Sequence, residues 1–383
     1  MMHSFNFFNY FSKKVREEIS ELYASTVIAN LALSIVLIFE PIFLYSALKF
    51  TIPQIFLFMA VVYAVYIVLI PWGGKIASIY GYKHAIAMSV PFQILFWMIL
   101  LISRQNPGLA FVAAICFGLQ KSLYWPGFHS LMARYADQGQ VGREFGVIYS
   151  LIGVTQIIGP FIGGWMSQYF SLTSTFIFAA IIYCFSIWPL FKAEEIFVPK
   201  VYNFSDTWKL YKLFPKKFLG YLGFGEELLF MTIWPVFIFI VVKNYAGTGL
   251  IATVAGFFAA ALALIIGRIT DQYTKRVLIK LGAFFSSLIW LARTIIPATV
   301  WTVSTVDTLA RTAKEMDFIP ISTVTYLRAE ETHVVPYIVF FEQSLSIGKL
   351  LACLIGMAVF ALTGSFMALF ILGALFSLLY MYI

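Results

Sequence analysis

Long apolar runs are the feature that most limits what this chain can fold into. A helix must cross about 30 Å of hydrocarbon at 1.5 Å per residue, so a membrane span needs roughly 20 apolar residues. Twelve runs of about this length occur, and the tenth is the least apolar. They lie near residues 22–48, 54–73, 84–103, 108–133, 145–168, 172–191, 218–242, 248–269, 277–297, 299–326, 335–361 and 365–383. The sequence therefore predicts twelve transmembrane segments.

The twelve segments are predicted to be helices. A backbone in lipid must satisfy its own hydrogen bonds, so it forms helices or a closed barrel. Barrel strands alternate apolar and polar residues, and runs such as MAVVYAVYIVLIPW at 59–72 do not alternate. The hydrophobic share of the chain, 61%, also exceeds the roughly 45–50% of soluble domains. We therefore expect an all-α membrane protein that has the lipid bilayer as its solvent.

The basic residues predict the orientation of the chain. With the N-terminus inside and twelve crossings, 18 of the 26 Lys and Arg residues fall in the N-terminal tail and the inner loops, and 3 fall in outer loops. Such a bias is the positive-inside signal of a membrane protein. We therefore expect both termini in the cytoplasm and the chain in the inner (plasma) membrane of a prokaryotic cell. No basic face on a soluble domain indicates nucleic acid as a partner.

The two halves of the chain repeat each other. The run FEPIF at 39–43 matches IWPVF at 233–237, and Lys49 and Lys243 follow at the same offset of 194 residues. Pro126 and Pro320 are also 194 residues apart. Several matches in the same order indicate duplication of one unit. We therefore predict two pseudo-symmetric six-helix bundles.

The chain is predicted to have four parts, which act together as a monomer. These are a cytoplasmic N-terminal tail at 1–21, a first bundle at 22–191, a cytoplasmic linker at 192–217 and a second bundle at 218–383. In the linker, SDTWKLYKLF at 205–214 mixes aromatic residues with lysines. This pattern is typical of a short interfacial helix with its apolar side in the lipid headgroups.

Two loop motifs, together with the topology, resemble the major facilitator superfamily of secondary transporters. The loop GKIASIYGYK at 74–83 is similar to the family pattern G-x-L-A-D-R-x-G-R-K at Gly74, Gly81 and Lys83, although serine replaces the aspartate. The second copy, GRITDQYTKR at 267–276, retains the acidic position. Its matching residues are Gly267, Asp271, Lys275 and Arg276. The resemblance implies twelve transmembrane helices in two bundles, and inner loops that gate the cytoplasmic face.

A glycine motif in the fifth segment resembles a motif of antiporters in this family. It reads GPFIGG and contains Gly159, Pro160, Gly163 and Gly164. Small residues let a neighbouring helix approach closely, and the proline removes a backbone donor and favours a bend. A pure packing role would need the same residues. The motif alone favours export by antiport slightly over import.

Charges in the tenth segment predict a wet cavity. Asp307, Arg311 and Lys314 lie within about a 60° wedge at 100° per residue, with Glu315 beside them. An ionised side chain at the bilayer centre costs at least about 2.5–3.5 kcal/mol, so this face must meet protein or water. Pairing of Asp307 with Arg311 on one helix is the structural alternative.

Polar and aromatic residues on other segments are candidates for the same cavity. The resemblance implies that segments one, four, seven and ten line it. The predicted substrate residues are Asn30, Ser34, Lys121, Tyr124, Trp125, Trp234, Arg311 and Lys314. Lys121 lies at the repeat position of Glu315, which suggests that the two face each other across the cavity. The cavity suits amphipathic or zwitterionic small molecules.

These observations predict a secondary active transporter that works by alternating access between two bundles. A buried carboxyl group would carry the coupling proton. The candidates, in order, are Glu315, Asp307, Glu227 and Glu40. The alternative is a non-transporting membrane sensor or assembly scaffold of the same fold. No nucleotide-binding, hydrolase or metal motif is present, so we expect no enzyme activity, cofactor or metal.

Overall fold

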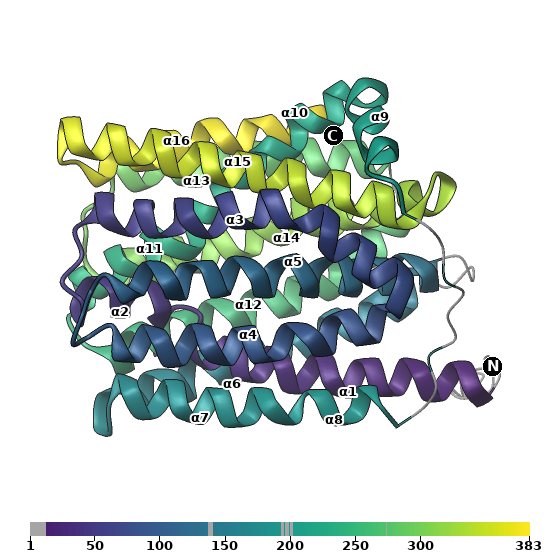
Figure 1. Cartoon of the computed structure of the whole chain (residues 1–383). Coiled ribbons are helices and arrows are strands. Elements are labelled where there is room, and N and C mark those ends of the chain that lie inside the picture. The colour runs from purple at the N-terminus through teal and green to yellow at the C-terminus, as the bar shows by residue number, and fades with distance from the viewer. Residues whose placement is uncertain (1–12, 137–140, 193–194, 196–198, 200–201, 273) are drawn as a thin grey trace, which may run out of the picture.

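The fold is all-helical over the described residues. The computed structural model describes residues 13–136, 141–192, 195, 199, 202–272 and 274–383. Figure 1 shows long helices running side by side, with the start of α1, the C-terminus and α9 toward one end of the molecule. This end is called the inner end below, because the charge bias predicts that it faces the cytoplasm.

The first half of the chain forms six transmembrane segments from eight helices. Their bounds are α1 Lys13–Val36, α2 Phe39–Ser46, α3 Ile52–Tyr80, α4 Tyr82–Ile102, α5 Leu109–Ala136, α6 Val141–Tyr169, α7 Leu172–Phe185 and α8 Ile187–Leu190. The first segment is broken at residues 37–38, between α1 and α2. The sixth segment is likewise divided, between α7 and α8.

The second half begins with a short helix at the inner end and then repeats the pattern of six segments. The bounds are α9 Phe204–Leu213, α10 Pro215–Tyr221, η1 Leu222–Phe224, α11 Gly225–Val242, α12 Tyr245–Gln272, α13 Lys275–Ile295, α14 Val300–Glu331, α15 Val334–Thr363, α16 Phe366–Leu379 and η2 Tyr380–Tyr382. The described helices thus form the twelve predicted transmembrane segments.

The duplication is visible in the backbone. Lys49 and Lys243 end the first segments of the two halves, and they are the non-glycine residues with positive φ among those described, at 57° and 62°. A left-handed residue is uncommon outside glycine. Its recurrence at the predicted offset of 194 residues supports the repeat.

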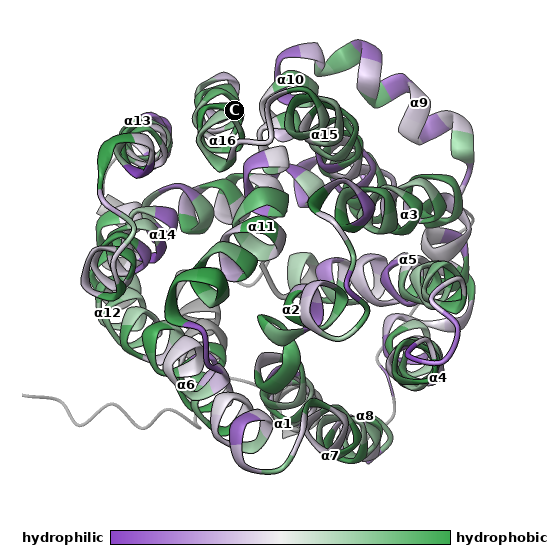
Figure 2. Cartoon of the chain, turned by 90° about the vertical axis from the view of Figure 1, so that its left-hand side faces the viewer, coloured by the Kyte–Doolittle hydropathy of each residue, from purple (hydrophilic) through white to green (hydrophobic). Residues whose placement is uncertain are grey.

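Apolar character follows the predicted spans. Eight helical segments of the described chain are long and apolar enough to cross a membrane, and α16 with η2 is a shorter apolar segment. In Figure 2 the helices form a ring around α2 and α11, and hydrophobic residues predominate on most of them. Val68, Ile181 and Leu288 are exposed. Exposed apolar surface on this scale indicates contact with lipid.

Two helix pairs hold the halves together. α6 packs along α12, and α3 packs along α15. Glycines allow both approaches: a Cβ on Gly164 would lie 3.0 Å from the Cα of Gly249, and one on Gly74 would lie 2.6 Å from the Cγ2 of Val339. Close backbone contact of this kind is typical of helix pairs in membranes.

Candidate functional site

A cavity lies between the two halves, near the centre of the molecule. It holds about 50 Å³, which is room for a few water molecules. Its wall is mostly apolar and aromatic, with charged groups from α2, α5, α11 and α15. The lining residues are Leu37, Glu40, Pro41, Leu44, Phe58, Met59, Tyr63, Phe96, Leu100, Phe117, Lys121, Glu227, Leu228, Met231, Thr232 and Lys349. The site is therefore amphipathic.

One ion pair in the cavity joins two helices of the second half, α11 and α15. Lys349 Nζ on α15 lies 2.8 Å from Glu227 Oε2 on α11, and the two side chains are only 11% and 13% exposed. Lys349 also lies above the ring of Tyr63 on α3, 5.6 Å from its centroid. The pair and the ring thus bring α3 of the first half together with α11 and α15 of the second half at the cavity wall.

Lys121 is the cation of the cavity that forms no ion pair within the described structure. Its Nζ lies 4.3 Å from the ring centroid of Phe117, one helical turn earlier on α5, in cation–π geometry. Within the described part of the chain, no carboxylate lies within ion-pair distance of it. Lys349 is already paired with Glu227, so Lys121 is the group that is available to an anionic ligand.

The break in the first segment positions Glu40. The chain leaves α1 at Val36 and resumes as α2 at Phe39, so Glu40 stands in the first turn of α2, where the helix dipole favours an anion. Trp97 Nε1 on α4 donates to Glu40 Oε1 at 2.8 Å. Among the described residues, no cation lies within ion-pair distance of this carboxyl group. Glu40 can therefore take up or lose a proton without breaking an ion pair.

The second half contains an equivalent tryptophan–carboxylate contact. Trp290 Nε1 on α13 donates to Glu226 Oε1 on α11 at 2.8 Å. Trp97 and Trp290 are 193 residues apart, the offset of the two loop motifs. Both halves thus use a tryptophan N–H group to orient a buried carboxylate. The two carboxylates, Glu40 and Glu226, lie at different positions of their segments.

The charges of α14 form a second cluster, inside the second half. Arg311 Nε lies 3.0 Å from Asp307 Oδ2, as the i,i+4 spacing predicts. Trp234 Nε1 on α11 donates to Asp307 Oδ1 at 2.8 Å. Lys314 forms an ion pair with Glu226. These charges face protein, as their cost in lipid requires, and none of them lines the central cavity.

Arg293 on α13 stabilises this cluster in a way that the sequence did not reveal. Its guanidinium carbon lies 3.9 Å from the ring centroid of Trp234 and 3.8 Å from that of Trp290. The side chain is buried, and its nitrogen atoms have no hydrogen-bond partner in the described structure. The two indoles that orient Asp307 and Glu226 thus hold a cation between their faces.

Glu315 is separate from both sets of partners. No ion pair of this residue is found within the described chain, and it does not line the central cavity. The predicted arrangement of Lys121 opposite Glu315 is therefore not what the cavity shows: Lys121 shares it with Glu40, Glu227 and Lys349. The difference arises because α3, α4 and α15 form the part of the cavity wall that the sequence predicted α14 to form.

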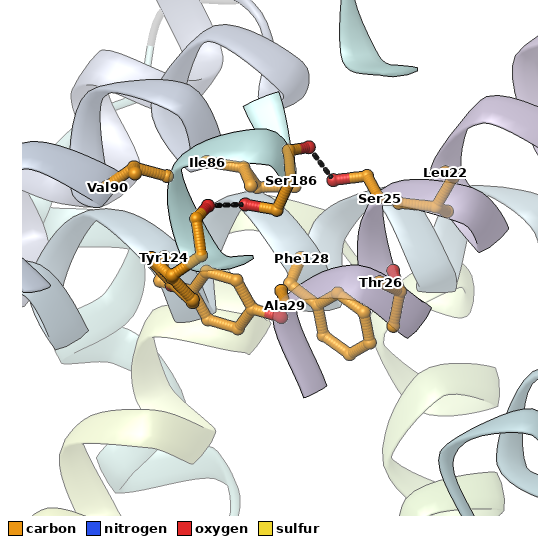
Figure 3. A pocket seen from close by; sticks show the side chains of 10 residues that line it. Leu22, Ser25, Thr26, Ala29, Ile86, Val90, Tyr124, Phe128 and Ser186 are labelled. Atoms are coloured by element: carbon orange, nitrogen blue, oxygen red, sulfur yellow. Dashed lines mark hydrogen bonds between the residues drawn. The ribbon is translucent and has the colours of Figure 1, made fainter. Parts of the chain in front are cut away.

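Two further predicted substrate residues, Tyr124 and Trp125, do not line the central cavity. Tyr124 lines a second, smaller cavity of about 10 Å³ with Ser25, Thr26 and Phe128. Figure 3 shows Ser25 bonded to the carbonyl oxygen of Ser186 at 2.7 Å. Trp125 stacks on the imidazole ring of His129, one helical turn later on α5, with the ring centroids 5.0 Å apart. This pocket has space for about one water molecule.

The side chains of Asn30 and Ser34 donate hydrogen bonds to backbone carbonyl groups. Asn30 Nδ2 donates to the carbonyl oxygen of Thr26 at 2.8 Å, within α1. Ser34 Oγ donates to the carbonyl oxygen of Thr155 on α6 at 2.9 Å. Neither residue lines the central cavity, so their part in substrate binding stays a prediction.

The first inner-loop motif is held by two carboxylates. Lys83 is buried and lies 3.3 Å from Glu21 Oε2 on α1. Glu195, in the segment that joins the halves, accepts hydrogen bonds from the backbone N–H groups of Tyr82 at 2.6 Å and Lys83 at 3.1 Å. Gly81 has φ 107°, and a Cβ there would lie 2.3 Å from Glu195. Only glycine suits this turn.

The second inner-loop motif is more open. A Cβ on Gly267 would meet nothing within 4 Å. Lys275 and Arg276 begin α13, and Arg276 is exposed. The side chain of Asp271 lies outside the described residues. The gating role of these residues stays a prediction.

The glycine motif of α6 lies against two helices at once. A Cβ on Gly159 would lie 2.0 Å from Ser34 Oγ, and one on Gly163 would lie 1.9 Å from the carbonyl oxygen of Ile35, both on α1. Gly164 faces α12 instead. Pro160 lies inside α6, and its carbonyl oxygen approaches Gly249. The motif therefore joins the first half to the second.

Substitution of Gly163 by alanine will destabilise the protein strongly, because the added methyl group would overlap a backbone atom that cannot rotate away. Gly267→Ala is the matched control, since its Cβ enters open space and alanine favours a helix by roughly 0.5–1 kcal/mol. Thermal unfolding in detergent, followed by tryptophan fluorescence, should show a lower midpoint for Gly163→Ala alone. Equal midpoints would mean that α1 and α6 are not in contact.

Some site residues were not among the predicted ones. Trp97 and Glu195 orient charged or polar groups, and Arg293 lies against Trp234, yet each of these partners is more than 50 residues away in the chain. The signal that could have found Trp97 and Trp290 is their offset of 193 residues. Within the described ranges, no group of three His, Cys, Asp or Glu residues could hold a metal ion.

Solved structures of transporters share the fold of this chain. The human organic anion transporter MFSD10 (TETRAN) superposes with a TM-score of 0.72, over 97% of this chain and 99% of that one, at 13% sequence identity. The nucleoside transporter NupG superposes with a TM-score of 0.73, over 95% and 98%, also at 13% identity. At this identity the likeness concerns the fold alone.

Sequence comparison places the chain in the same group. The proton-coupled antiporter flippase LtaA of Staphylococcus aureus is 30% identical over 79 residues, which cover 20% of this chain and 20% of that protein. The family model of the Major Facilitator Superfamily matches residues 22–242, more than half of the chain. With twelve membrane segments in two repeated halves and a cavity between them, the chain belongs to the Major Facilitator Superfamily of membrane transporters.

Proposed function

We propose that this transporter exchanges protons for a small amphipathic molecule and exports that molecule by alternating access. The central cavity carries the proposal. It lies between the two halves, it is largely apolar, and it contains two charged groups, Glu40 and Lys121, that have no ion-pair partner among the described residues. A ligand with an apolar body and an anionic or zwitterionic head fits this combination.

Proton coupling is proposed to use the carboxyl groups of the cavity. Glu40 accepts a hydrogen bond from Trp97 and has no ion-pair partner in the described part of the chain, and Glu227 is paired with Lys349. Burial in a low-dielectric interior favours the neutral form of a carboxyl group, and a nearby cation opposes this. A proton on Glu40 would therefore alter the charge that Lys121 and the substrate meet.

Asp307 and Glu315 are weaker candidates for the coupling proton. Asp307 is completely buried and is engaged by both Arg311 and Trp234. Glu315 lies outside the cavity lining. On this basis we rank Glu40 and Glu227 first, which reverses the order expected from the sequence.

Antiport and export rest on two supporting observations. The segment GPFIGG lies between α1 and α12, where a bend or sliding contact would move the first half against the second. LtaA is a proton-coupled antiporter flippase, which agrees with exchange of a proton for an amphipathic molecule. The match covers one fifth of each chain, so it supports the proposal without naming the substrate.

Proton movement in reconstituted vesicles tests this function. Purified protein is placed in liposomes that contain a pH-sensitive dye, and an anionic bile acid, a zwitterionic lysophospholipid and a cationic dye are added in turn. At least one amphiphile should drive proton flux with the wild type, and Glu40→Gln should reduce this flux by at least about tenfold. Glu331→Gln, an exposed carboxylate at the end of α14, is the control.

Two results would overturn the proposal. Absence of amphiphile-driven flux with any compound of the panel would favour a sensor or scaffold. Unchanged flux in both Glu40→Gln and Glu227→Gln would remove the cavity carboxyl groups from proton coupling.

A further inference from the structure

We infer that His129 and Glu342 form a second proton-binding site, which latches the inner side of the transporter shut. The latch consists of Tyr66, His129, Tyr326 and Glu342. It is distinct from the carboxyl groups of the central cavity. The inference deepens the proposed proton coupling and rests on it for its physiological role, while its geometry stands on its own.

The latch is a short, buried chain of polar contacts. His129 Nε2 lies 2.8 Å from Glu342 Oε1, and the two side chains are 12% and 4% exposed. Tyr66 donates its hydroxyl proton to Glu342 Oε2 at 2.7 Å. His129 Nδ1 lies 2.5 Å from the hydroxyl oxygen of Tyr326. Both imidazole nitrogens and both carboxyl oxygens are thus engaged.

Each of these contacts crosses from one half of the chain to the other. Tyr66 and His129 belong to α3 and α5 of the first half, whereas Tyr326 and Glu342 belong to α14 and α15 of the second. The inner side can open only if these helices separate. Opening would therefore break the ion pair and both tyrosine hydrogen bonds together.

The surroundings of His129 and Glu342 make the strength of this ion pair depend on the proton of His129. Trp125 stacks on the imidazole ring, with a centroid distance of 5.0 Å and an interplanar angle of 15°, and Phe341 covers its edge at 5.9 Å. Among the described residues, His129 is the cation partner within ion-pair distance of Glu342. Within the described structure, no lysine or arginine lies within ion-pair distance of the Glu342 carboxylate, so its ion pair depends on the charge of His129.

Other titratable groups act on the latch from a greater distance. They lie on α3, α5 and α15, which pack against one another. These groups are Tyr63 on α3, Lys121 on α5 and Lys349 on α15. Lys121 and Lys349 belong to the central cavity, so substrate or proton binding there changes the field at Glu342.

The sign of the pH effect follows from the contact. A protonated imidazole attracts the carboxylate at 2.8 Å, whereas a neutral one contributes only a hydrogen bond. Histidine changes charge between about pH 5 and pH 8. The contact joins the two halves, so a charged imidazole holds the inner side closed, and a neutral imidazole at higher pH holds it less firmly.

A neutral contact beside the latch provides a matched control. Gln343 Nε2 donates to the carbonyl oxygen of Ile67 on α3 at 3.0 Å, and Gln343 Oε1 accepts from the hydroxyl group of Tyr211 on α9 at 2.9 Å. This contact also joins the two halves and lies one residue from Glu342. It contains no group that titrates in the relevant range.

Spin labels across the inner end test the latch without substrate or a proton gradient. Cysteines replace Tyr80 at the end of α3 and Glu331 at the end of α14, both exposed, in a background without Cys116, Cys184 and Cys353. Pulsed dipolar spectroscopy then gives the fractions of short and long distances. From pH 6 to pH 8.5, the closed-to-open ratio should fall about tenfold, the effect of one charge-assisted hydrogen bond.

Variants separate a proton latch from simple packing. His129→Gln and Glu342→Gln should abolish the pH dependence. Gln343→Ala should lower the closed fraction at every pH while the pH dependence remains. A control variant replaces His3, His84 and His333 by glutamine and keeps His129 as the remaining histidine. It should retain the full pH dependence, and it provides this test even if the latch variants fail to fold.

The outcomes also separate this inference from the proposed function. A closed fraction that is equal at pH 6 and pH 8.5, or one that still depends on pH in Glu342→Gln, would overturn the latch. A pH-dependent closed fraction in a protein without amphiphile-driven proton flux would support the latch and remove the transport proposal.

Discussion

Lys349→Met is expected to lower the stability of the protein by about 3–5 kcal/mol, the usual effect of removing one partner from a buried ion pair. Glu227 would be left as an unpaired carboxylate in a largely apolar cavity, because Lys349 is its ion-pair partner at 2.8 Å. Unfolding by SDS in mixed micelles, followed by tryptophan fluorescence, would measure the change.

The double variant Lys349→Met/Glu227→Gln should recover most of this loss, since the neutral amide no longer needs a cation. Lys209→Met is the control, because Lys209 pairs with Asp206 on the surface of α9 and is 74% exposed, where ion pairs contribute little. If the single and double variants were equally unstable, Lys349 would stabilise the structure through packing of its aliphatic chain alone.

Lys121→Gln is expected to have the opposite profile, with transport lost and stability retained. No described carboxylate lies within ion-pair distance of Lys121, so its neutralisation leaves no orphan charge. A charged hydrogen bond to a ligand is typically worth about 1.5–3 kcal/mol, which corresponds to a loss of roughly tenfold to a hundredfold in amphiphile-driven proton flux.

Lys121→Arg keeps the charge and should retain part of the flux. The measurement is the vesicle assay, with SDS unfolding of the same preparations as the check on folding. Flux at the wild-type level in Lys121→Gln would show that substrate recognition does not depend on this cation, and the anionic or zwitterionic head of the proposed substrate would have no partner left.

The fold could be predicted because it follows from the solvent. Apolar length determines where the chain crosses lipid, and the repeat determines how the crossings are grouped. Lys49 and Lys243 illustrate this, because the offset of 194 residues found in the sequence recurs as the same left-handed turn in both halves. Local pairs were predictable for the same reason: Asp307 and Arg311 meet because they are four residues apart on one helix.

The partners between helices could not be predicted, because they depend on how each helix is rotated about its axis. Glu342 and Lys349 share a stripe of α15 in the sequence, yet the structure directs Glu342 to His129 on α5 and Lys349 to Glu227 on α11. The same limit explains the cavity. The cost of charge indicated that α14 faces protein, but not that the enclosed space lies beside α3, α4 and α15.

The segment that joins the halves is fastened on both sides. Glu195 holds it to the first half at the start of α4. Thr207 and Tyr211 of α9 hold it to the second half, through the carbonyl oxygen of Pro336 and the side chain of Gln343. In the proposed alternating-access cycle, the length of chain between these anchors would limit how far one half can move against the other. Lengthening it would change how far the transporter opens, although none of these three anchoring residues lines the central cavity.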